Sequence, residues 1–148
     1  MRYVIAKTSL TDSTRAIIAR LDKQCFPADT PEPLDNRTWW LVYHITGRGK
    51  SQQRTPVGYA GYKEANYPRH VFFCRAGILP AHRRQGLHRR LIKVRTQYAR
   101  RSGYLGVVTY TTRINTTSAN GLVACGFKLY NPKYEYAGQA LYMIKEFA

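Results

Sequence analysis

The sequence predicts an α/β protein with a mixed, mostly antiparallel sheet of about seven strands flanked by helices. Three observations predict this fold. The length of 148 residues suits one domain with its own core. The hydrophobic fraction of 44% and the charged fraction of 22% are ordinary for a globular protein. Segments rich in Val, Tyr and Thr alternate with amphipathic helical patterns, and no repeat or linker interrupts residues 1–148, which are expected to form a single domain.

The first third of the chain predicts a strand, a helix and a loop. Residues 2–7 have the β-branched and aromatic content of a strand, and the apolar spacing that follows predicts a helix ending near Gln24. Its candidate N-caps are Thr11, Asp12 and Ser13. Three prolines then predict a loop over residues 25–36, which contains the chain's only cluster of acidic residues.

The remainder predicts six strands and two helices. The strands are expected over residues 39–46, 57–64, 71–79, 104–112, 127–130 and 140–147. One helix is predicted to begin near Gly86 and to stop at Gly103, with an apolar face of Leu87, Leu91, Val94 and Tyr98. A second, short helix is capped by Asn115 or Thr117 and closed by Gly126.

Several classes of protein are excluded by composition. No apolar run approaches the ~20 residues that span a bilayer, and the first ten residues lack the apolar core of a secretory signal, so we expect a cytoplasmic protein that does not bind membranes. Cys25, Cys74 and Cys125 are odd in number and form no CxxC pair, which favours free, buried thiols over a disulfide framework or a metal site, with a catalytic thiol as the alternative.

The net charge of +16 indicates an anionic partner. No Asp or Glu occurs in residues 65–134, which contain thirteen Lys and Arg residues, eight of them between Arg83 and Arg101. Five cations are expected on the outer face of the long helix: Arg89, Arg90, Lys93, Arg100 and Arg101. A solvated face that only aids solubility is the simpler explanation.

A turn before the long helix has the features of a phosphate site. No Ser, Thr, Asp or Asn stands where its N-cap should be, so the first backbone amides lack a side-chain acceptor. Arg83 and Arg84 add positive charge, and Gly86 allows close approach of a ligand to the backbone. A pyrophosphate fits this chemistry, although an Arg-rich turn with water-capped amides would share the pattern.

The segment Arg83-Arg84-Gln85-Gly86-Leu87-His88 follows Gly77-Ile78-Leu79-Pro80, and Asn115-x-x-Ser118 precedes Gly126-Phe127 by the expected spacing. Both motifs, in register with the predicted elements, resemble the acetyl-CoA signature of the GNAT superfamily of N-acetyltransferases. The resemblance implies a GNAT-like domain over nearly the whole chain, and transfer of an acetyl group from acetyl-CoA to a primary amine of a small molecule or protein. The acceptor and the choice between monomer and homodimer stay open.

The same resemblance implies the cofactor-binding residues. The amides from Arg84 to Arg89 would hold the pyrophosphate, and Gly77, Ile78 and Leu79 would run beside the pantetheine arm. The other residues carried over are Arg83, Gln85, Gly86, Leu87, His88, Asn115, Ser118 and Asn120. His88 departs from the family, which has Gly or Ala at its position.

The catalytic groups are less clearly marked. The amide of Ile78 is the candidate for polarising the acetyl carbonyl. The family's usual acid is a Tyr at the position of Leu122, so Tyr110 and Tyr130 are the replacement candidates for protonating the thiolate. Glu64 is the candidate base. Asp29 and Glu32 are alternative bases, or ligands for a cationic substrate. One of the two tryptophans, Trp39 or Trp40, is expected to face the substrate cleft, and Trp40 is the preferred candidate. Burial of both in the core is the simpler expectation.

Two alternatives follow from the charge. The cations on the far helix face lie too far along the helix for a cofactor at its N-terminus, and they could follow a phosphate backbone. One alternative is therefore an enzyme of the same fold that modifies DNA bases, in the manner of phage Mom-type proteins. The other is a non-catalytic nucleic-acid module, as the missing Tyr at Leu122 would allow.

Overall fold

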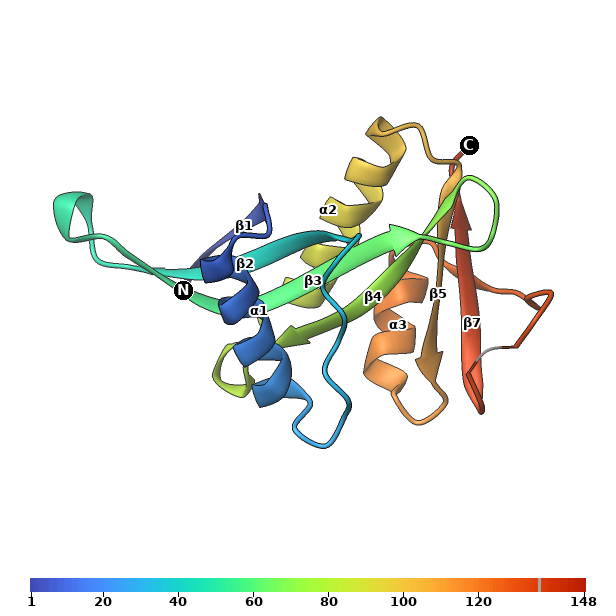
Figure 1. Ribbon diagram of the computed structural model, residues 1–148, viewed down its shortest axis with the longest axis horizontal. Coiled ribbons are helices and arrows are strands. Elements are labelled where there is room, and N and C mark those ends of the chain that lie inside the picture. Colours follow the sequence, from blue (N-terminus) through green and yellow to red (C-terminus); the bar gives the residue numbers. More distant parts are fainter. Residues whose placement is uncertain (136) are drawn as a thin grey trace. The chain divides into compact units, whose positions relative to one another are not determined.

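The computed structural model describes residues 1–135 and 137–148 and contains a seven-stranded sheet with the strand order β1-β2-β3-β4-β5-β7-β6 (Figure 1). The strands are β1 (Arg2–Thr8), β2 (Thr38–Thr46), β3 (Gln53–Glu64), β4 (His70–Ile78), β5 (Gly106–Thr112), β6 (Lys128–Leu129) and β7 (Ala140–Glu146). The helices are α1 (Asp12–Cys25), α2 (Leu87–Arg101) and α3 (Thr116–Ala124), with short 3-10 turns η1 (Gly49–Ser51) and η2 (Pro80–His82). The predicted α/β fold with a mixed sheet is confirmed.

The chain forms two compact units. Unit 1 comprises residues 1–61 and 75–91, and unit 2 comprises residues 62–74 and 92–148. Strands β3 and β4 and helix α2 contribute residues to both.

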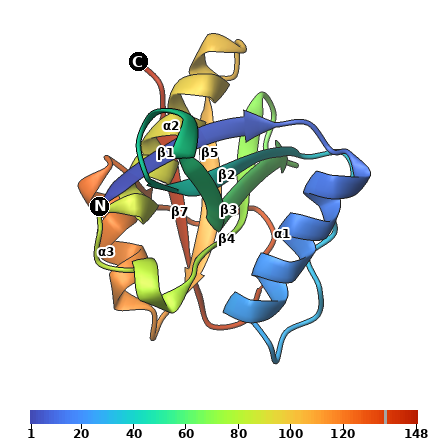
Figure 2. The same ribbon diagram turned by 90° about the vertical axis from the view of Figure 1, so that its left-hand side faces the viewer.

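Unit 1 combines α1 with the strands β1 and β2, most of β3 and the end of β4 (Figure 2). Strand β1 runs antiparallel to β2, from Arg2 opposite Ile45 to Thr8 opposite Trp39. Thr11 caps α1 and forms a reciprocal capping box with Thr14, one of the three caps that the sequence allowed. Fully buried side chains from the helix and strands, among them Ile18, Leu21, Trp39, Leu41 and Tyr59, form the core.

Unit 2 combines the start of β4 with β5, β6, β7, α3 and most of α2. Strand β4 runs parallel to β5 over three residue pairs, from His70–Gly106 to Phe72–Val108. Strand β7 is antiparallel to β5 along its whole length, and it also pairs with β6. The parallel β4–β5 ladder, together with the antiparallel pairings β1–β2, β5–β7 and β6–β7, makes the sheet mixed, as expected.

Two strands differ in length from the prediction. Strand β3 begins at Gln53 rather than at residue 57, because its first residues are polar and exposed and give no hydrophobic signal. The predicted loop before it is reduced to a turn at η1, in which Gly47 and Gly49 take left-handed conformations. Strand β6 contains only Lys128 and Leu129, which are both exposed.

The buried face of α2 also differs from the prediction. Tyr98, expected on the apolar face, is 37% exposed, and Val94 is half-buried. In unit 2 the buried positions of the helix are Ile92, Arg95, Thr96 and Ala99. Buried polar residues, Arg95 and Thr96, therefore take the place of Val94 and Tyr98 on the buried face of the helix. The five cations expected on the outer face are exposed, as predicted.

Two further observations concern membranes and thiols. Among residues 1–135 and 137–148, none of the helices has the length and apolar character that crossing a membrane would require. The three cysteines are free thiols; Cys74 and Cys125 are buried and Cys25 is half-buried.

Candidate functional site

The turn between β4 and α2 in unit 1 presents backbone amides to solvent. Arg84 (φ 64°) and Gly86 (φ 73°) both take left-handed conformations, and the carbonyl of Gly86 accepts the helix's first hydrogen bond, from the amide of Arg90 at 3.2 Å. Because Gly86 has no side chain, it cannot cap the first-turn amides. Successive backbone amides in a tight turn with left-handed residues before a helix can form a concave, anion-binding arrangement.

The side chains in and after this turn differ in their exposure to solvent. Buried Leu87 anchors the start of α2, while Arg84, Gln85, His88 and Arg89 are exposed. Arg84 and Arg89 therefore add two solvent-accessible guanidinium groups to the amides of the turn, which suits an anion with several phosphate oxygens.

Arg83 has a different environment from its neighbours. Its Nε donates a hydrogen bond to the carbonyl oxygen of Ile78 at 2.9 Å, which ties the turn to the end of β4. Burial raises the pKa of the Cys25 thiol, and the Arg83 guanidinium acts in the opposite direction. The structure thus brings together Arg83, Ile78 and Cys25, and part of the Arg83 guanidinium is used inside the protein.

The end of β4 has no space for a side chain at Gly77. A Cβ there would lie 2.8 Å from Tyr59 Cε1 and 2.9 Å from Cys25 Sγ, so only glycine allows α1 and β3 to approach so closely. The amide of Leu79 donates to the carbonyl of Val57 on β3 at 2.9 Å. Because successive amides of a strand point to opposite edges, the amide of Ile78 points away from β3.

The start of the turn is held by aromatic side chains of unit 1. Tyr3 Oη and His82 Nδ1 form a 2.9 Å hydrogen bond, and the His44 and His82 rings lie 4.8 Å apart. Burial and the neighbouring His44 lower the pKa of His82. His82 is therefore neutral at neutral pH, and its hydrogen bond with Tyr3 holds η2 against β1.

A buried carboxylate, Asp22, links α1 to the strands β3 and β4 in unit 1. Asp22 on α1 accepts hydrogen bonds from Tyr59, from Arg75 at 2.9 and 3.0 Å, and from the Glu32 amide at 3.0 Å. Burial alone would raise the pKa of Asp22, but these hydrogen bonds lower it below its usual value. Burial and Asp22 raise the pKa of Tyr59, while Asp22 outweighs burial and raises that of Arg75.

The acidic loop is folded onto Arg75. Glu32 forms an ion pair with Arg37, and its Oε2 lies 3.7 Å from Arg75 Nε. Asp29 lies 3.9 Å from Arg75 Nη2, and its side chain is 55% exposed. Of the two acidic residues predicted to bind a cationic substrate, Asp29 is thus the more accessible.

The two tryptophans of β2 are both buried. Trp39 is 0% exposed and its Nε1 donates to the Leu34 carbonyl at 2.9 Å, while Trp40 is 2% exposed. Core burial, the simpler expectation for this pair, is therefore what the structure shows.

Three predicted cofactor residues lie in unit 2, on α3 and at its cap. The side chain of Asn115 caps α3, accepting from the amide of Ser118 at 3.1 Å. Asn120 is exposed one turn later. Leu122, at the family's tyrosine position, is 5% exposed and belongs to the core.

The candidate acids and base also lie in unit 2, in two separate groups. The ring of Tyr110 lies 5.9 Å from Phe72 and 6.2 Å from Tyr142, and burial and the neighbouring tyrosines raise the pKa of Tyr130. Glu64 accepts a 3.3 Å hydrogen bond from the hydroxyl of Tyr104. The structure thus places Tyr110 and Tyr130 around Tyr142 and pairs Glu64 with Tyr104.

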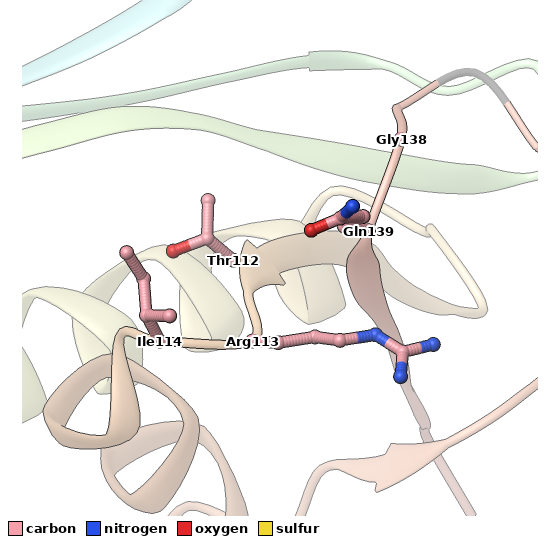
Figure 3. Close-up of a pocket in the computed structure, with 5 residues that line it drawn as sticks. All are labelled: Thr112, Arg113, Ile114, Gly138 and Gln139. Carbon is pink, nitrogen blue, oxygen red and sulfur yellow. The ribbon is translucent and has the colours of Figure 1, made fainter.

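A pocket of about 400 Å³ opens at the end of β5 (Figure 3). Its lining residues are Thr112, Arg113, Ile114, Gly138 and Gln139. Figure 3 shows the amide of Gln139 pointing toward Thr112, while the Arg113 side chain extends away from both. Tyr110 and Thr112 are exposed on either side of buried Thr111, so they share one face of β5.

Sequence reasoning did not identify two notable residues, Asp22 and Arg95. Asp22 and Arg95 lie on the buried faces of α1 and α2, where an ionisable residue among apolar neighbours is the available signal. Burial lowers the pKa of Arg95 to about 9, and its guanidinium lies 3.9 Å above the Phe73 ring. The left-handed conformation of Arg84 has no sequence signal. No group of His, Cys, Asp and Glu suited to a metal ion occurs in the described part of the chain.

Comparisons with known proteins identify the family. Residues 15–127 match the model of the acetyltransferase (GNAT) family. No curated protein sequence matches the chain.

Solved structures share the fold at low sequence identity. The IAA acetyltransferase from Bacillus cereus ATCC 14579 is 12% identical, with a TM-score of 0.75 and coverage of 99% of this chain and 100% of that one. The ribosomal-protein-S18-alanine N-acetyltransferase from Escherichia coli is 13% identical, with a TM-score of 0.70 and coverage of 97% and 94%. An acetyltransferase of Bacillus subtilis in complex with CoA is 13% identical, with a TM-score of 0.72 and coverage of 99% and 100%.

The family model covers most of the chain, and GNAT acetyltransferases use acetyl-CoA as the acetyl donor. The chain therefore belongs to the GNAT acetyltransferase family.

Proposed function

We propose that this protein is an acetyl-CoA-dependent N-acetyltransferase that acetylates a primary amine of a small molecule or protein. The observation that carries the proposal is the turn before α2, where left-handed Arg84 and Gly86 lead into a helix whose N-cap position is a glycine, which has no side chain. Backbone amides, a helix N-terminus and the exposed guanidiniums of Arg84 and Arg89 together suit a pyrophosphate.

The cofactor contacts are assigned within each unit. In unit 1, the amides from Arg84 to Arg89 hold the pyrophosphate, and the backbone of Gly77, Ile78 and Leu79 accompanies the pantetheine arm. In unit 2, the Asn115 side-chain oxygen caps α3, which leaves its Nδ2 to donate to the cofactor. Ser118 and Asn120 are the further candidates on α3.

The amide of Ile78 is the proposed donor to the acetyl carbonyl. It points away from β3, and the carbonyl of the same residue is held by Arg83. A backbone donor fixed in this way stabilises developing negative charge on an oxygen without reorganisation.

The transfer also requires two proton movements. Acetyl-CoA supplies a thioester; the amine nitrogen bonds to its carbonyl carbon, the carbon–sulfur bond breaks, and the sulfur leaves as a thiolate. We assign Tyr110 to protonate that thiolate, because it shares a face of β5 with the pocket at Thr112. Glu64, which lies in a separate group with Tyr104, is the candidate for accepting the proton that the amine nitrogen loses. In unit 1, the exposed side chain of Asp29 is the candidate for attracting a cationic acceptor.

A pair of glycine variants tests the proposal. Gly86 and Gly49 both have positive φ, and at neither would a Cβ meet any atom within 4 Å. Gly86→Ala therefore introduces backbone strain, without a steric clash, in the turn of residues 83–86, called the phosphate turn below. Gly49→Ala introduces the same kind of strain in the hairpin turn between β2 and β3.

The readout is the release of the CoA thiol from acetyl-CoA with a panel of amines, together with mass spectrometry of the acetylated product. We expect turnover in the wild type and in Gly49→Ala, and a loss of about tenfold or more in Gly86→Ala. If Gly49→Ala and Gly86→Ala lose equal activity, or if no amine of the panel is acetylated, the proposal fails.

A further inference from the structure

A group of cations lies on unit 2 around the C-terminal end of α2. Lys93, Arg100 and Arg101 are exposed on the helix, and Arg69 is exposed in the turn between β3 and β4. These four residues are called the basic patch below. Among the described residues, none of the four has a carboxylate within ion-pair distance.

Backbone contacts hold the parts of the basic patch together. The Leu105 amide donates to the Arg69 carbonyl at 2.7 Å, and the Phe147 amide donates to the Leu105 carbonyl at 2.8 Å. The Arg100 guanidinium lies 5.6 Å from the centre of the Phe147 ring. Figure 1 shows the β3–β4 turn, the end of α2 and the C-terminal end of β7 meeting at this place. Lys93 and Arg100 are seven residues apart, two helical turns on one side of α2.

The acidic residues of unit 2 do not neutralise the basic patch. Unit 2 contains ten Lys and Arg residues but three acidic ones, Glu64, Glu135 and Glu146. Glu64 accepts a hydrogen bond from Tyr104, and Glu146 is exposed on β7 opposite Gly106. Helix α2 itself contains no acidic residue, so its like charges repel one another without an anion.

From this arrangement we infer that the basic patch docks the phosphate backbone of a nucleic-acid duplex. Arginine guanidiniums match phosphate oxygens in a two-pronged geometry, and three of the four cations are arginines. Lys93 and Arg100, two turns apart on one side of a rigid helix, suit the regularly spaced phosphates of a duplex. A single strand would also use stacking of its bases on aromatic rings. The neighbouring Tyr67 and Tyr98, 42% and 37% exposed, have tilted or edge contacts with other rings.

The inference is independent of acetyl transfer. The phosphate turn proposed for the cofactor uses cations of unit 1, and the basic patch uses only cations of unit 2. Either assignment can fail without the other.

Binding of a labelled duplex, measured by fluorescence anisotropy as salt rises, tests the inference. One probe is a DNA duplex and the other an RNA duplex, each of about 20 base pairs, because either could supply the phosphate backbone. With four phosphate contacts, the plot of log K against log salt is expected to have a slope of about −3 to −4. The variant K93Q/R100Q/R101Q should bind at least about tenfold more weakly, with a slope shallower by about 3.

A matched control separates the basic patch from total charge. The variant R20Q/K23Q/R54Q removes three exposed cations from unit 1 and reaches the same net charge. Glutamine has a helix propensity close to those of Lys and Arg at the helical positions, and Arg54 is exposed at the start of β3, so both variants should fold. Thermal unfolding with and without acetyl-CoA checks this separately. The control should bind the duplex nearly as the wild type does.

Three results would overturn the inference. These are the absence of duplex binding by the wild type, equal weakening in both variants, and tighter binding to phosphatidylserine vesicles than to either duplex. The last result would assign the basic patch to a membrane surface instead.

Discussion

At the scale of single residues, ionisable groups on apolar faces are the main difference between sequence and structure. Asp22 follows Leu21 on α1 and lies with Ile18 and Cys25 on one side of the helix, which is the position of a core residue. Periodicity indicates that this face is buried, but not which partners neutralise the carboxylate. Those partners, Tyr59 and Arg75, come from β3 and β4, far away in the sequence.

Asp22→Asn should destabilise unit 1 strongly. The substitution leaves the half-buried Arg75 guanidinium without its closest carboxylate, which should cost about 2–4 kcal/mol of unfolding free energy. The matched change Asp35→Asn removes a carboxylate that is 72% exposed in its pair with Arg15, and it should cost less than about 1 kcal/mol. Urea denaturation measures both. Similar losses in the two variants would contradict the role given to Asp22.

The same residue predicts a pH dependence. The pKa of Asp22 is lowered in the folded protein, so its stabilisation is complete above about pH 5 and is lost as the pH falls through the folded pKa. The difference in unfolding free energy between the wild type and Asp22→Asn should therefore be constant between about pH 6 and pH 5 and shrink from there towards pH 2. A difference that stays constant over this range would show that the carboxylate charge is not involved.

Tyr110→Phe tests the proposed acid. If Tyr110 protonates the leaving thiolate, its loss should lower kcat by about 10²-fold while the KM for acetyl-CoA changes little. Tyr130→Phe and Tyr134→Phe are the controls; Tyr134 is 74% exposed. A large loss of kcat in Tyr130→Phe, with Tyr110→Phe unaffected, would transfer the role to Tyr130.

At the scale of elements, local patterns predicted the positions of the helices and most strands. The cap of α1 and the glycine after α2 are encoded within a few residues. The polar start of β3 and the two-residue strand β6 carry no such pattern, because pairing with a neighbouring strand defines them. The turn before α2 is also marked in the sequence by spacing and glycine placement, and its role as a phosphate site stays a prediction. The positions of the acid and the base cannot be predicted from such local patterns, because they depend on which strands lie side by side.

Two glycine substitutions should have opposite effects on stability. In Gly77→Ala, the new Cβ would lie within 3 Å of Tyr59 and Cys25, so β4 or α1 must shift, at a cost of about 2 kcal/mol or more. In Gly121→Ala, on α3, the nearest atom is Ile92 Cδ1 at 3.9 Å, and the helix should gain up to about 1 kcal/mol. Thermal unfolding measures both, and a neutral Gly77→Ala would show that the packing at the end of β4 is loose.

At the scale of the whole molecule, the charge of +16 separates into two parts. The cations at the turn before α2 accompany a backbone arrangement suited to a pyrophosphate, and the family explains their presence. The basic patch of unit 2 has no such explanation in acetyl transfer. A net charge on its own indicates only an anion. The cations of unit 1 are assigned to the proposed cofactor site, and those of unit 2 to the proposed duplex.

The most direct test of the central claim is a calorimetric titration with acetyl-CoA and with S-acetylpantetheine, which lacks the pyrophosphate and the adenosine 3′-phosphate, so the comparison with Gly86→Ala isolates the contribution of the turn. The wild type and Gly49→Ala should prefer acetyl-CoA by about 10²-fold or more, because the turn supplies several charge-assisted hydrogen bonds. Gly86→Ala should lose most of this preference while its binding of S-acetylpantetheine changes little. Equal affinity of the wild type for the two ligands would contradict the account.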